Sequence, residues 1–322
     1  MKYFIALDSG GYKTESVLFD QEGTVHAYER GRGANAFDVG PTEASDRICA
    51  TVDSMLRRLP AGETLGGVFG SVSVSYYYPE IEQNISRYVA RHVGKARCRI
   101  DSIVSSVMAA GLGREDGVCL ISGTGSYCCV RDHGKHRRYI GSTGYMLDTG
   151  GSGYVIGQQA LIAASRERDG RGPSTLLTPL LEKEMGETLL EHLPVIYAGG
   201  RSYISSFSHS VFVARDLGDA VAKRIIDDAV DYFGEALETA YRIMGRPYRG
   251  VLGGGVFIHE KDYAREVCAR APEGCTLQVI DTPTLYGGAL EAMWLAGEEI
   301  PNGFKSRFVE TYALQPGQGS AW

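Results

Sequence analysis

One pattern constrains the fold more than any other because it occurs twice: an apolar run, a turn of small residues and a second apolar run. The first copy is LDSGGYKTESVLFD (7–20) and the second is LISGTGSYCCVRD (120–132). Such internal duplication predicts two similar domains that face each other across a ligand cleft. Glycine-rich turns let backbone N–H groups approach an anion, so both turns are candidate phosphate-binding sites.

The segments around these turns alternate between strand and helix periodicity. The first 113 residues predict the order βββαβαβα, with strands at 2–8, 15–20, 25–30, 65–75 and 95–100 and helices at 43–59, 80–93 and 102–112. The remainder predicts strands within 117–132 and at 135–141, 250–258 and 276–280, and helices around 152–166, 219–244 and 285–297. The tail from Pro301 has no clear periodicity and is expected to be irregular.

These elements predict an α/β fold, and 322 residues correspond to about two domains. We expect an N-terminal domain at 1–114 and a C-terminal domain at 115–322. The closing helix near 285–297 is expected either to stay with the second domain or to pack back on the first.

Composition and charge exclude some classes of binding partner and indicate a cellular compartment. The formal net charge is −6 and there is no basic run, which argues against nucleic acid and anionic membranes as partners. No stretch approaches the roughly 20 apolar residues of a membrane span, and the N-terminal apolar run is too short for a signal peptide. Seven cysteines without a CxxC motif favour reduced thiols in the cytoplasm. We interpret the adjacent Cys128 and Cys129 as a buried, inert pair rather than a redox or metal site.

Two aspartates stand where strands end. Asp8 lies beside the first turn, where it either forms an Asx-turn or helps to hold a hydrated Mg²⁺ ion. Asp101 ends the predicted strand segment KARCRID (95–101) and starts a helix. It is therefore either a helix N-cap or a general base at the carboxyl end of a strand.

Other polar and aromatic groups have less specific patterns. Asn35 and Asp148 are short polar residues in glycine-rich loops, suited either to turns or to binding hydroxyl groups. The HGKH segment (133–136) fits a solvated turn better than a metal site. The three tyrosines at 76–78 are expected to pack or to line the rim of a cleft.

Six motifs in this order resemble the BadF/BadG/BcrA/BcrD ATPase family, which includes N-acetylglucosamine kinase and belongs to the actin-like ATPase superfamily. The motifs are DSGGYKT (8–14), GANAFDVG (33–40), LISGTGS (120–126), GYMLDTGGSGYVIG (144–157), GDAVAKRII (218–226) and VLGGGVF (251–257). The resemblance covers roughly residues 2–297. It implies two actin-like, ribonuclease H-like domains with a nucleotide and sugar cleft between them.

The resemblance also implies roles for single residues. In the first phosphate motif Asp8 binds Mg²⁺, and Gly10, Gly11, Lys13 and Thr14 contact the nucleotide phosphates. The second phosphate motif comprises Gly123, Thr124, Gly125 and Ser126, and the adenosine motif comprises Gly253, Gly254 and Gly255. Asp101 matches the aspartate that takes the proton from the sugar hydroxyl. Asn35, Gly144 and Asp148 contact the sugar.

Two motifs depart from the usual family pattern. The first motif usually reads DGGGTKT, whereas Ser9 and Tyr12 here replace a glycine and a threonine. The later motif usually reads GDEGSG, whereas DTGGSG places Asp148 one position early and leaves Thr149 and Gly150 at the acidic positions. This shift leaves the sugar specificity open.

The resemblance implies a kinase that uses ATP and Mg²⁺ to phosphorylate an amino sugar, with N-acetylglucosamine the favourite and glucosamine or N-acetylmuramic acid close behind. It also implies a homodimer. Two alternatives remain: an ATPase that activates a 2-hydroxyacyl-CoA dehydratase, and a sugar-binding sensor without catalysis. The first needs cysteines for an iron–sulfur cluster, and the second is motivated by Tyr12 and Asp148.

Overall fold

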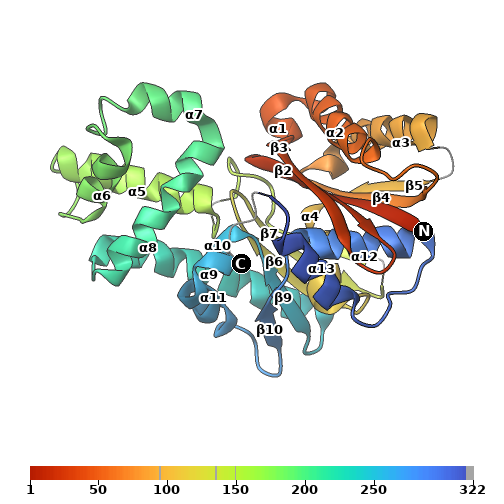
Figure 1. Cartoon of the computed structure of the whole chain (residues 1–322). Coiled ribbons are helices and arrows are strands. Elements are labelled where there is room, and N and C mark those ends of the chain that lie inside the picture. Colours follow the sequence, from red (N-terminus) through yellow and green to blue (C-terminus); the bar gives the residue numbers. More distant parts are fainter. Residues whose placement is uncertain (94–95, 135, 149, 317–322) are drawn as a thin grey trace. The chain divides into compact units, whose positions relative to one another are not determined.

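A computed structural model describes residues 1–93, 96–134, 136–148 and 150–316 of the chain (Figure 1). Its contacts divide the chain into two compact units: unit 1 contains residues 1–114 and 280–322, and unit 2 contains residues 115–279. Each unit has one five-stranded sheet with helices packed on it. The predicted α/β class is confirmed.

The sheet of unit 1 begins with the predicted meander. Its strands are β1 (Lys2–Ser9), β2 (Lys13–Asp20), β3 (Val25–Arg32), β4 (Thr64–Val72) and β5 (Arg97–Asp101). The order is β3-β2-β1-β4-β5, with antiparallel pairing among β1, β2 and β3 and parallel pairing from β1 through β4 to β5. The carboxyl ends of β1, β4 and β5 therefore lie at one edge of the sheet.

Helices cover both faces of this sheet. They are α1 (Ala36–Val39), α2 (Pro41–Leu56), the 3₁₀ helix η1 (Ser75–Tyr77), α3 (Pro79–Val93), α4 (Ile103–Leu112), α12 (Thr284–Ala296) and α13 (Phe304–Ala313). Because strand side chains alternate, Ile5 and Leu7 join a core with α2 and α3, whereas Phe4 and Ala6 face a second core that includes α12 and α13.

The end of the chain belongs to unit 1, although the sequence analysis grouped residues 280–322 with the second domain. Helix α12 packs on α4, β1 and β4. A Cβ atom on Gly287 would come within 1.8 Å of the Ser106 carbonyl oxygen, so only glycine permits this approach of α12 to α4.

The expectation of an irregular tail is wrong. Residues 304–313 form α13, and Phe304, Phe308 and Tyr312 are fully buried. Their spacing of four places all three on one helix face. There Phe308 meets the ring of Phe19, and Tyr312 meets that of Tyr28.

Unit 2 repeats the sheet topology of unit 1. Its strands are β6 (Gly117–Ser122), β7 (Ser126–Asp132), β8 (His136–Ile140), β9 (Arg249–Gly253) and β10 (Thr276–Val279). The order β10-β9-β6-β7-β8 matches β5-β4-β1-β2-β3, with the same antiparallel meander and the same parallel pairs. The duplication in the sequence is thus a duplication of the sheet.

The helices of unit 2 are α5 (Gly153–Arg168), α6 (Leu177–Met185), α7 (Leu193–Ser206), α8 (Ser208–Asp216), α9 (Ala220–Met244), α10 (Gly255–His259) and α11 (Lys261–Cys268). Helix α9 buries one apolar stripe, which includes Phe233 and Leu237, in the core of the unit. Helices α5 to α8 gather beside the sheet of this unit (Figure 1). Within the described residues, no helix is long and apolar enough to cross a membrane.

Candidate functional site

The sheet register of unit 1 brings the two predicted aspartates to one edge. Asp8 on β1 pairs with Ser71 on β4, and Ser71 pairs with Asp101 on β5. Side chains in register on parallel strands share a face, so all three lie on the same side of the sheet. With about 4.8 Å between neighbouring strands, the Asp8 and Asp101 backbones are about 10 Å apart. The hydroxyl of Ser71 hydrogen-bonds that of Ser106 on α4, which identifies this face.

Asp8 is partly buried at the end of β1. Burial raises the pKa of its carboxyl group to about 7; the negative charge of Glu15 adds to this effect and Lys13 opposes it. Within the described part of the chain, the Asp8 carboxylate has no hydrogen bond or ion pair. A carboxylate without a protein partner at a glycine-rich turn suits a hard cation, so this residue fits Mg²⁺.

Glu15, which the sequence analysis missed, lies opposite Asp8 on β2. It is only 8% exposed. Its Oε2 forms an ion pair with Lys13 Nζ at 2.6 Å, and its Oε1 accepts a hydrogen bond from the Tyr28 hydroxyl at 2.7 Å. Lys13, predicted to bind phosphate, is therefore paired with Glu15 in this structure. The available signal was a charged residue within a strand that is otherwise buried.

The first glycine turn is held from both sides. Within the turn, Gly10 N donates to Lys13 O at 2.9 Å. From outside, Ala34 N donates to Gly10 O at 3.0 Å. A Cβ atom on Gly33 would lie 2.3 Å from Gly11 O. The GANAFDVG segment therefore begins in direct contact with the turn.

Thr14, also assigned to the phosphates, is almost fully buried at the start of β2. Its hydroxyl donates to Arg32 O at 2.9 Å and is 2.8 Å from the Ser9 hydroxyl. These bonds join β1, β2 and β3 at the base of the turn. In this structure the Thr14 hydroxyl therefore stabilises the base of the turn.

Asn35 is the N-cap of α1, a short helix in the segment predicted as a loop. Its Oδ1 accepts a hydrogen bond from Phe37 N at 2.9 Å. No partner of its Nδ2 occurs among the described residues. The capping bond orients the amide and leaves its NH₂ group able to donate to a ligand hydroxyl.

Asp101 is the last residue of β5, and Ser102 is the N-cap of α4. Asp101 Oδ1 accepts a hydrogen bond from Ser102 N at 2.7 Å, and Oδ2 accepts one from the Arg99 guanidinium at 2.5 Å. The side chain is 16% exposed. These two donors hold a partly accessible carboxylate at the sheet edge, where a ligand hydroxyl can come within hydrogen-bond distance of it.

In unit 2 the second glycine turn is bonded to the segment that precedes α5. Ser122 Oγ donates to Gly151 O at 2.5 Å, and Ser126 Oγ donates to Gly150 O at 2.6 Å. Gly153 N donates to Gly123 O at 2.8 Å. The turn, with the predicted residues Thr124 and Gly125, and the start of α5 are therefore one assembly.

The predicted adenosine motif, residues 253–255, contacts the same turn. β9 ends at Gly253 and α10 begins at Gly255, so the strand predicted over 250–258 is wrong beyond residue 253. Gly254 has φ +92°, and a Cβ atom there would lie 2.4 Å from Ser122 O. This glycine permits both the sharp exit from β9 and the close approach to β6.

Asp148 is bound within unit 2. Its Oδ2 accepts hydrogen bonds from Ser142 N and from the Tyr232 hydroxyl, the latter at 2.9 Å. Gly144, with φ +89°, turns the chain so that Asp148 N donates to Gly144 O at 2.9 Å. Thr149, at a usual acidic position, lies outside the described residues.

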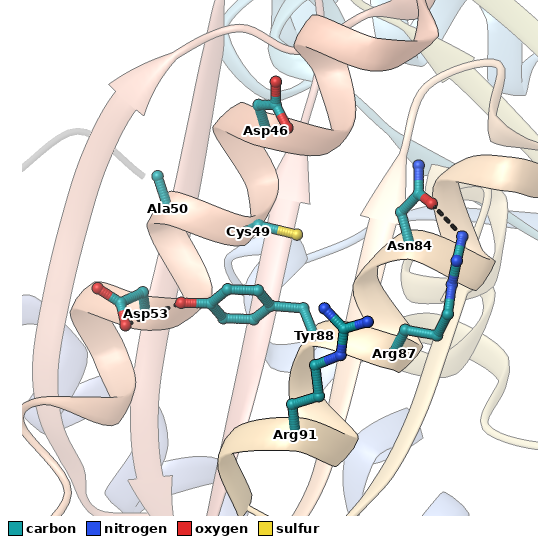
Figure 2. Close-up of a pocket in the computed structure, with 8 residues that line it drawn as sticks. All are labelled: Asp46, Cys49, Ala50, Asp53, Asn84, Arg87, Tyr88 and Arg91. Atoms are coloured by element: carbon teal, nitrogen blue, oxygen red, sulfur yellow. Dashed lines mark hydrogen bonds between the residues drawn. The ribbon is translucent and has the colours of Figure 1, made fainter.

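A shallow cavity of about 440 Å³ lies elsewhere in unit 1, between α2 and α3 (Figure 2). Tyr88 crosses it, and its hydroxyl donates to Asp53 Oδ1 at 2.9 Å. None of the predicted site residues lines this cavity. It also lies on the α2 and α3 face of the sheet, opposite to the face that carries Asp8 and Asp101.

A model of the BadF/BadG/BcrA/BcrD ATPase family matches residues 5–267. The chain belongs to this family. An N-acetylmuramic acid/N-acetylglucosamine kinase of Clostridium acetobutylicum is 34% identical over 246 residues, which is 71% of this chain and 76% of that protein. An N-acetyl-D-glucosamine kinase of Dictyostelium discoideum is 25% identical over 264 residues, 75% of this chain and 80% of that one.

Solved structures share the fold. A Chromobacterium violaceum protein, provisionally assigned as an N-acetylglucosamine kinase, has a TM-score of 0.70 at 19% identity, covering 92% of this chain and 99% of that one. A ROK family glucokinase from Streptomyces griseus, in complex with glucose and AMPPNP, has a TM-score of 0.58 at 17% identity, covering 91% and 99%. These similarities confirm the actin-like fold of the family.

Tyr12, the unusual tyrosine of the family's first motif, lies in the first turn, but its side chain is directed away from it. Tyr12 is 65% exposed, and the Arg30 guanidinium of β3 sits 5.6 Å from its ring centroid. This cation–π contact holds the ring over β3. The replacement of a threonine therefore removes a hydroxyl without filling the turn.

The adjacent cysteines of this family member are fully buried on β7, as expected. Burial raises the pKa of the Cys128 thiol well above its usual range. Within the described residues, no three metal-ligating side chains gather to hold an ion. The prediction for HGKH falls partly on Lys135, which lies outside the described residues.

Proposed function

We propose that this protein is an ATP-dependent kinase that transfers the γ-phosphoryl group to a hydroxyl of an amino sugar. N-acetylglucosamine is the first candidate, and N-acetylmuramic acid and glucosamine follow. The kinases of Clostridium acetobutylicum and Dictyostelium discoideum support this substrate class. The observation that carries the proposal is the register of Asp8, Ser71 and Asp101 at one sheet edge, beside a glycine turn.

Asp101 is the proposed general base. The sugar hydroxyl oxygen attacks the γ-phosphorus while the bond from that phosphorus to the bridging oxygen of ADP breaks. The hydroxyl proton passes to the Asp101 carboxylate. Arg99 and Ser102 N hold this carboxylate in place, so it needs no rearrangement as the proton arrives. Asn35 would orient the sugar through its unpaired amide NH₂ group.

The phosphate groups are assigned to the two glycine turns, whose backbone N–H groups suit an anion. Lys13 would exchange its ion pair with Glu15 for the nucleotide. Asp8 would hold Mg²⁺, which supplies charge neutralisation on the phosphates when bound. The 253–255 turn, in contact with Ser122, would meet the adenosine.

The test is ADP release from Mg-ATP with a panel of amino sugars and hexoses and a no-sugar control. We expect ADP release that depends on an amino sugar. Asp101→Asn should keep ATP and sugar binding but lose at least about 100-fold in kcat, within the range for a general base. Asp227→Asn, at an exposed carboxylate on α9, is the matched control. Turnover of Asp101→Asn equal to the control would remove Asp101 from this role.

The same assay separates the alternatives. ADP release without any sugar would favour an ATPase coupled to a partner protein, such as a dehydratase activator. The buried Cys128 and Cys129 argue against that function, since a shared iron–sulfur cluster needs accessible thiolates. Sugar binding without ADP release would favour a sensor.

We also propose a cytoplasmic homodimer with no nucleic-acid or membrane partner. None of the seven cysteines is in a disulfide, which supports a reducing compartment. The dimer rests on the family resemblance, and sedimentation velocity of the full chain tests it.

A further inference from the structure

Three aromatic rings stand exposed at the carboxyl edge of the unit 1 sheet. Phe37 on α1 is 45% exposed, and Tyr76 and Tyr77 on η1 are 42% and 52% exposed. We call these three rings the aromatic platform. Large aromatic side chains exposed together mark binding surfaces more often than isolated ones do. The sequence pattern of three tyrosines at 76–78 has no role in the phosphoryl-transfer chemistry proposed above.

The rings of the aromatic platform support one another. The Tyr77 centroid is 5.7 Å from that of Phe37, in a stacked arrangement, and 4.1 Å from that of Tyr76. Tyr78 meets Phe37 edge-on at 6.1 Å and also packs against the core of α2 and α3. The exposed rings therefore form one group, which Tyr78 connects to the core.

The backbone beneath the aromatic platform is strained. Val74 has φ 59° and ψ 12°, a left-handed conformation that is an outlier for a β-branched residue. Its side chain is buried, and Tyr77 N donates to Val74 O at 3.1 Å. Ser73 N donates to Ser9 O at 2.9 Å, which ties the loop to the first glycine turn. Such strain concentrates in ligand-binding segments.

The aromatic platform adjoins the groups assigned to the sugar. Phe37 N is the donor to Asn35 Oδ1, so the platform begins at the residue that follows Asn35 by two positions. The loop that carries the tyrosines follows β4 directly, and η1 contacts β5, which ends at Asp101. A ligand held by Asn35 and Asp101 would therefore have the platform beside it.

We propose that the aromatic platform binds a second pyranose ring, so that the protein takes amino sugars extended by a glycosidic bond. Pyranoses present rows of C–H groups, whose partial positive charge matches the negative face of an aromatic ring. The tyrosine hydroxyls at the rim can meet the sugar hydroxyls. The assignment of the first ring to Asn35 and Asp101 rests on the proposed function.

The test compares N-acetylglucosamine with its β-1,4-linked disaccharide by isothermal titration calorimetry without nucleotide. Wild-type protein should bind the disaccharide about tenfold more tightly, equivalent to about 1.4 kcal/mol. Tyr77→Ala should lose this advantage and keep its affinity for the monosaccharide. Tyr77→Phe should retain the advantage, because it retains the ring. Tyr197→Ala, at an 84% exposed tyrosine on α7, is the matched control and should bind as wild type.

Three results would overturn the proposal. The first is a wild-type affinity for the disaccharide no higher than for the monosaccharide. The second is an equal loss of both ligands in Tyr77→Ala, which would place the first ring on the platform. The third is a change of oligomeric state in Tyr77→Ala but not in Tyr197→Ala, which would assign the platform to a second copy of the chain. If no sugar supports ADP release yet Tyr77-dependent disaccharide binding remains, the proposed kinase fails and the platform stands.

Discussion

Gly33 offers the sharpest test of how the first glycine turn is built. In Gly33→Ala the new Cβ would lie 2.3 Å from Gly11 O and 2.7 Å from Gly10 O. Real Cβ atoms essentially never come closer than 3.0 Å to a non-bonded heavy atom of another residue, so the chain must move by at least about 0.7 Å (3.0 Å against 2.3 Å). Both obstacles are backbone atoms, and no side chain can rotate away to make room.

The magnitude follows from what this movement breaks. The shift strains the hydrogen bond from Ala34 N to Gly10 O, worth about 0.5–1.5 kcal/mol, and overpacking adds about 1–3 kcal/mol. The free energy of unfolding should therefore fall by about 2–4 kcal/mol. A misplacement of about 1 Å can cost about 100-fold in rate, so kcat/KM for ATP should fall by about tenfold to 100-fold.

The assay pairs urea unfolding with ADP release at varied ATP concentration. Gly31→Ala is the matched control, because apart from its chain neighbours no residue has an atom within 4 Å of the place that its new methyl group would take. Gly31 also lies on β3, the strand that leads to the turn contact. We expect the control to stay within about 0.5 kcal/mol and twofold of wild type, as surface substitutions usually do. If Gly33→Ala behaves like Gly31→Ala in both measurements, the contact between segment 33–35 and the turn does not shape the nucleotide site.

Two further predictions concern the carboxylates of Asp8 and Asp219. Asp8→Asn should abolish sugar-dependent ADP release but stabilise the ligand-free protein above pH 7 by about 2 kcal/mol, half the full value of its pKa shift because Asp8 is partly solvated. Since the folded pKa of about 7 exceeds the unfolded value, the free energy of unfolding of wild type should fall by this amount relative to Asp8→Asn as pH rises from about 4 to 7. Melting curves that are the same at pH 5 and pH 8 for both proteins would refute this. Asp219→Ala should lower the free energy of unfolding at pH 7 by about 1–3 kcal/mol, because Asp219 caps α9 through Ala222 N and also accepts from Leu176 N. Burial raises the pKa of Asp219, but these hydrogen bonds outweigh burial and lower it overall, so the loss should shrink as urea unfolding is repeated at pH values falling below about 4.

The sheets were predictable because both carry their signal locally. β1 and β6 are continuous apolar runs that end at small-residue turns, and each is followed by an antiparallel partner. Parallel pairing of β4 with β1 and of β9 with β6 follows from the intervening helices. Because the same pattern occurs in both halves of the chain, the strand assignment in each half supports the assignment in the other.

The misses have particular physical causes. Phe304, Phe308 and Tyr312 have helical spacing, but the other residues of α13 are mostly polar, so the apolar face was not recognised. Its significance depends on the partner rings on β2 and β3, which the sequence alone does not identify. Glu15 stood out locally as a charged residue within a buried strand, but its position opposite Asp8 follows from the pairing of β1 with β2. The end of β9 at Gly253 depends on the positive φ of Gly254, which no side-chain pattern reveals.

The displaced Asp148 has a structural explanation. A Cβ atom on Gly150, at a usual acidic position of the family, would lie 1.8 Å from the Tyr232 ring, so no acidic side chain fits there. Tyr232 instead donates its hydroxyl to Asp148 Oδ2, which Ser142 N also holds. Within the described residues, Asp148 Oδ1 has no partner. The Tyr232 ring thus fills the space beside Gly150, and its hydroxyl helps to hold Asp148. We propose that the other carboxylate oxygen of Asp148 accepts a hydrogen bond from a sugar hydroxyl.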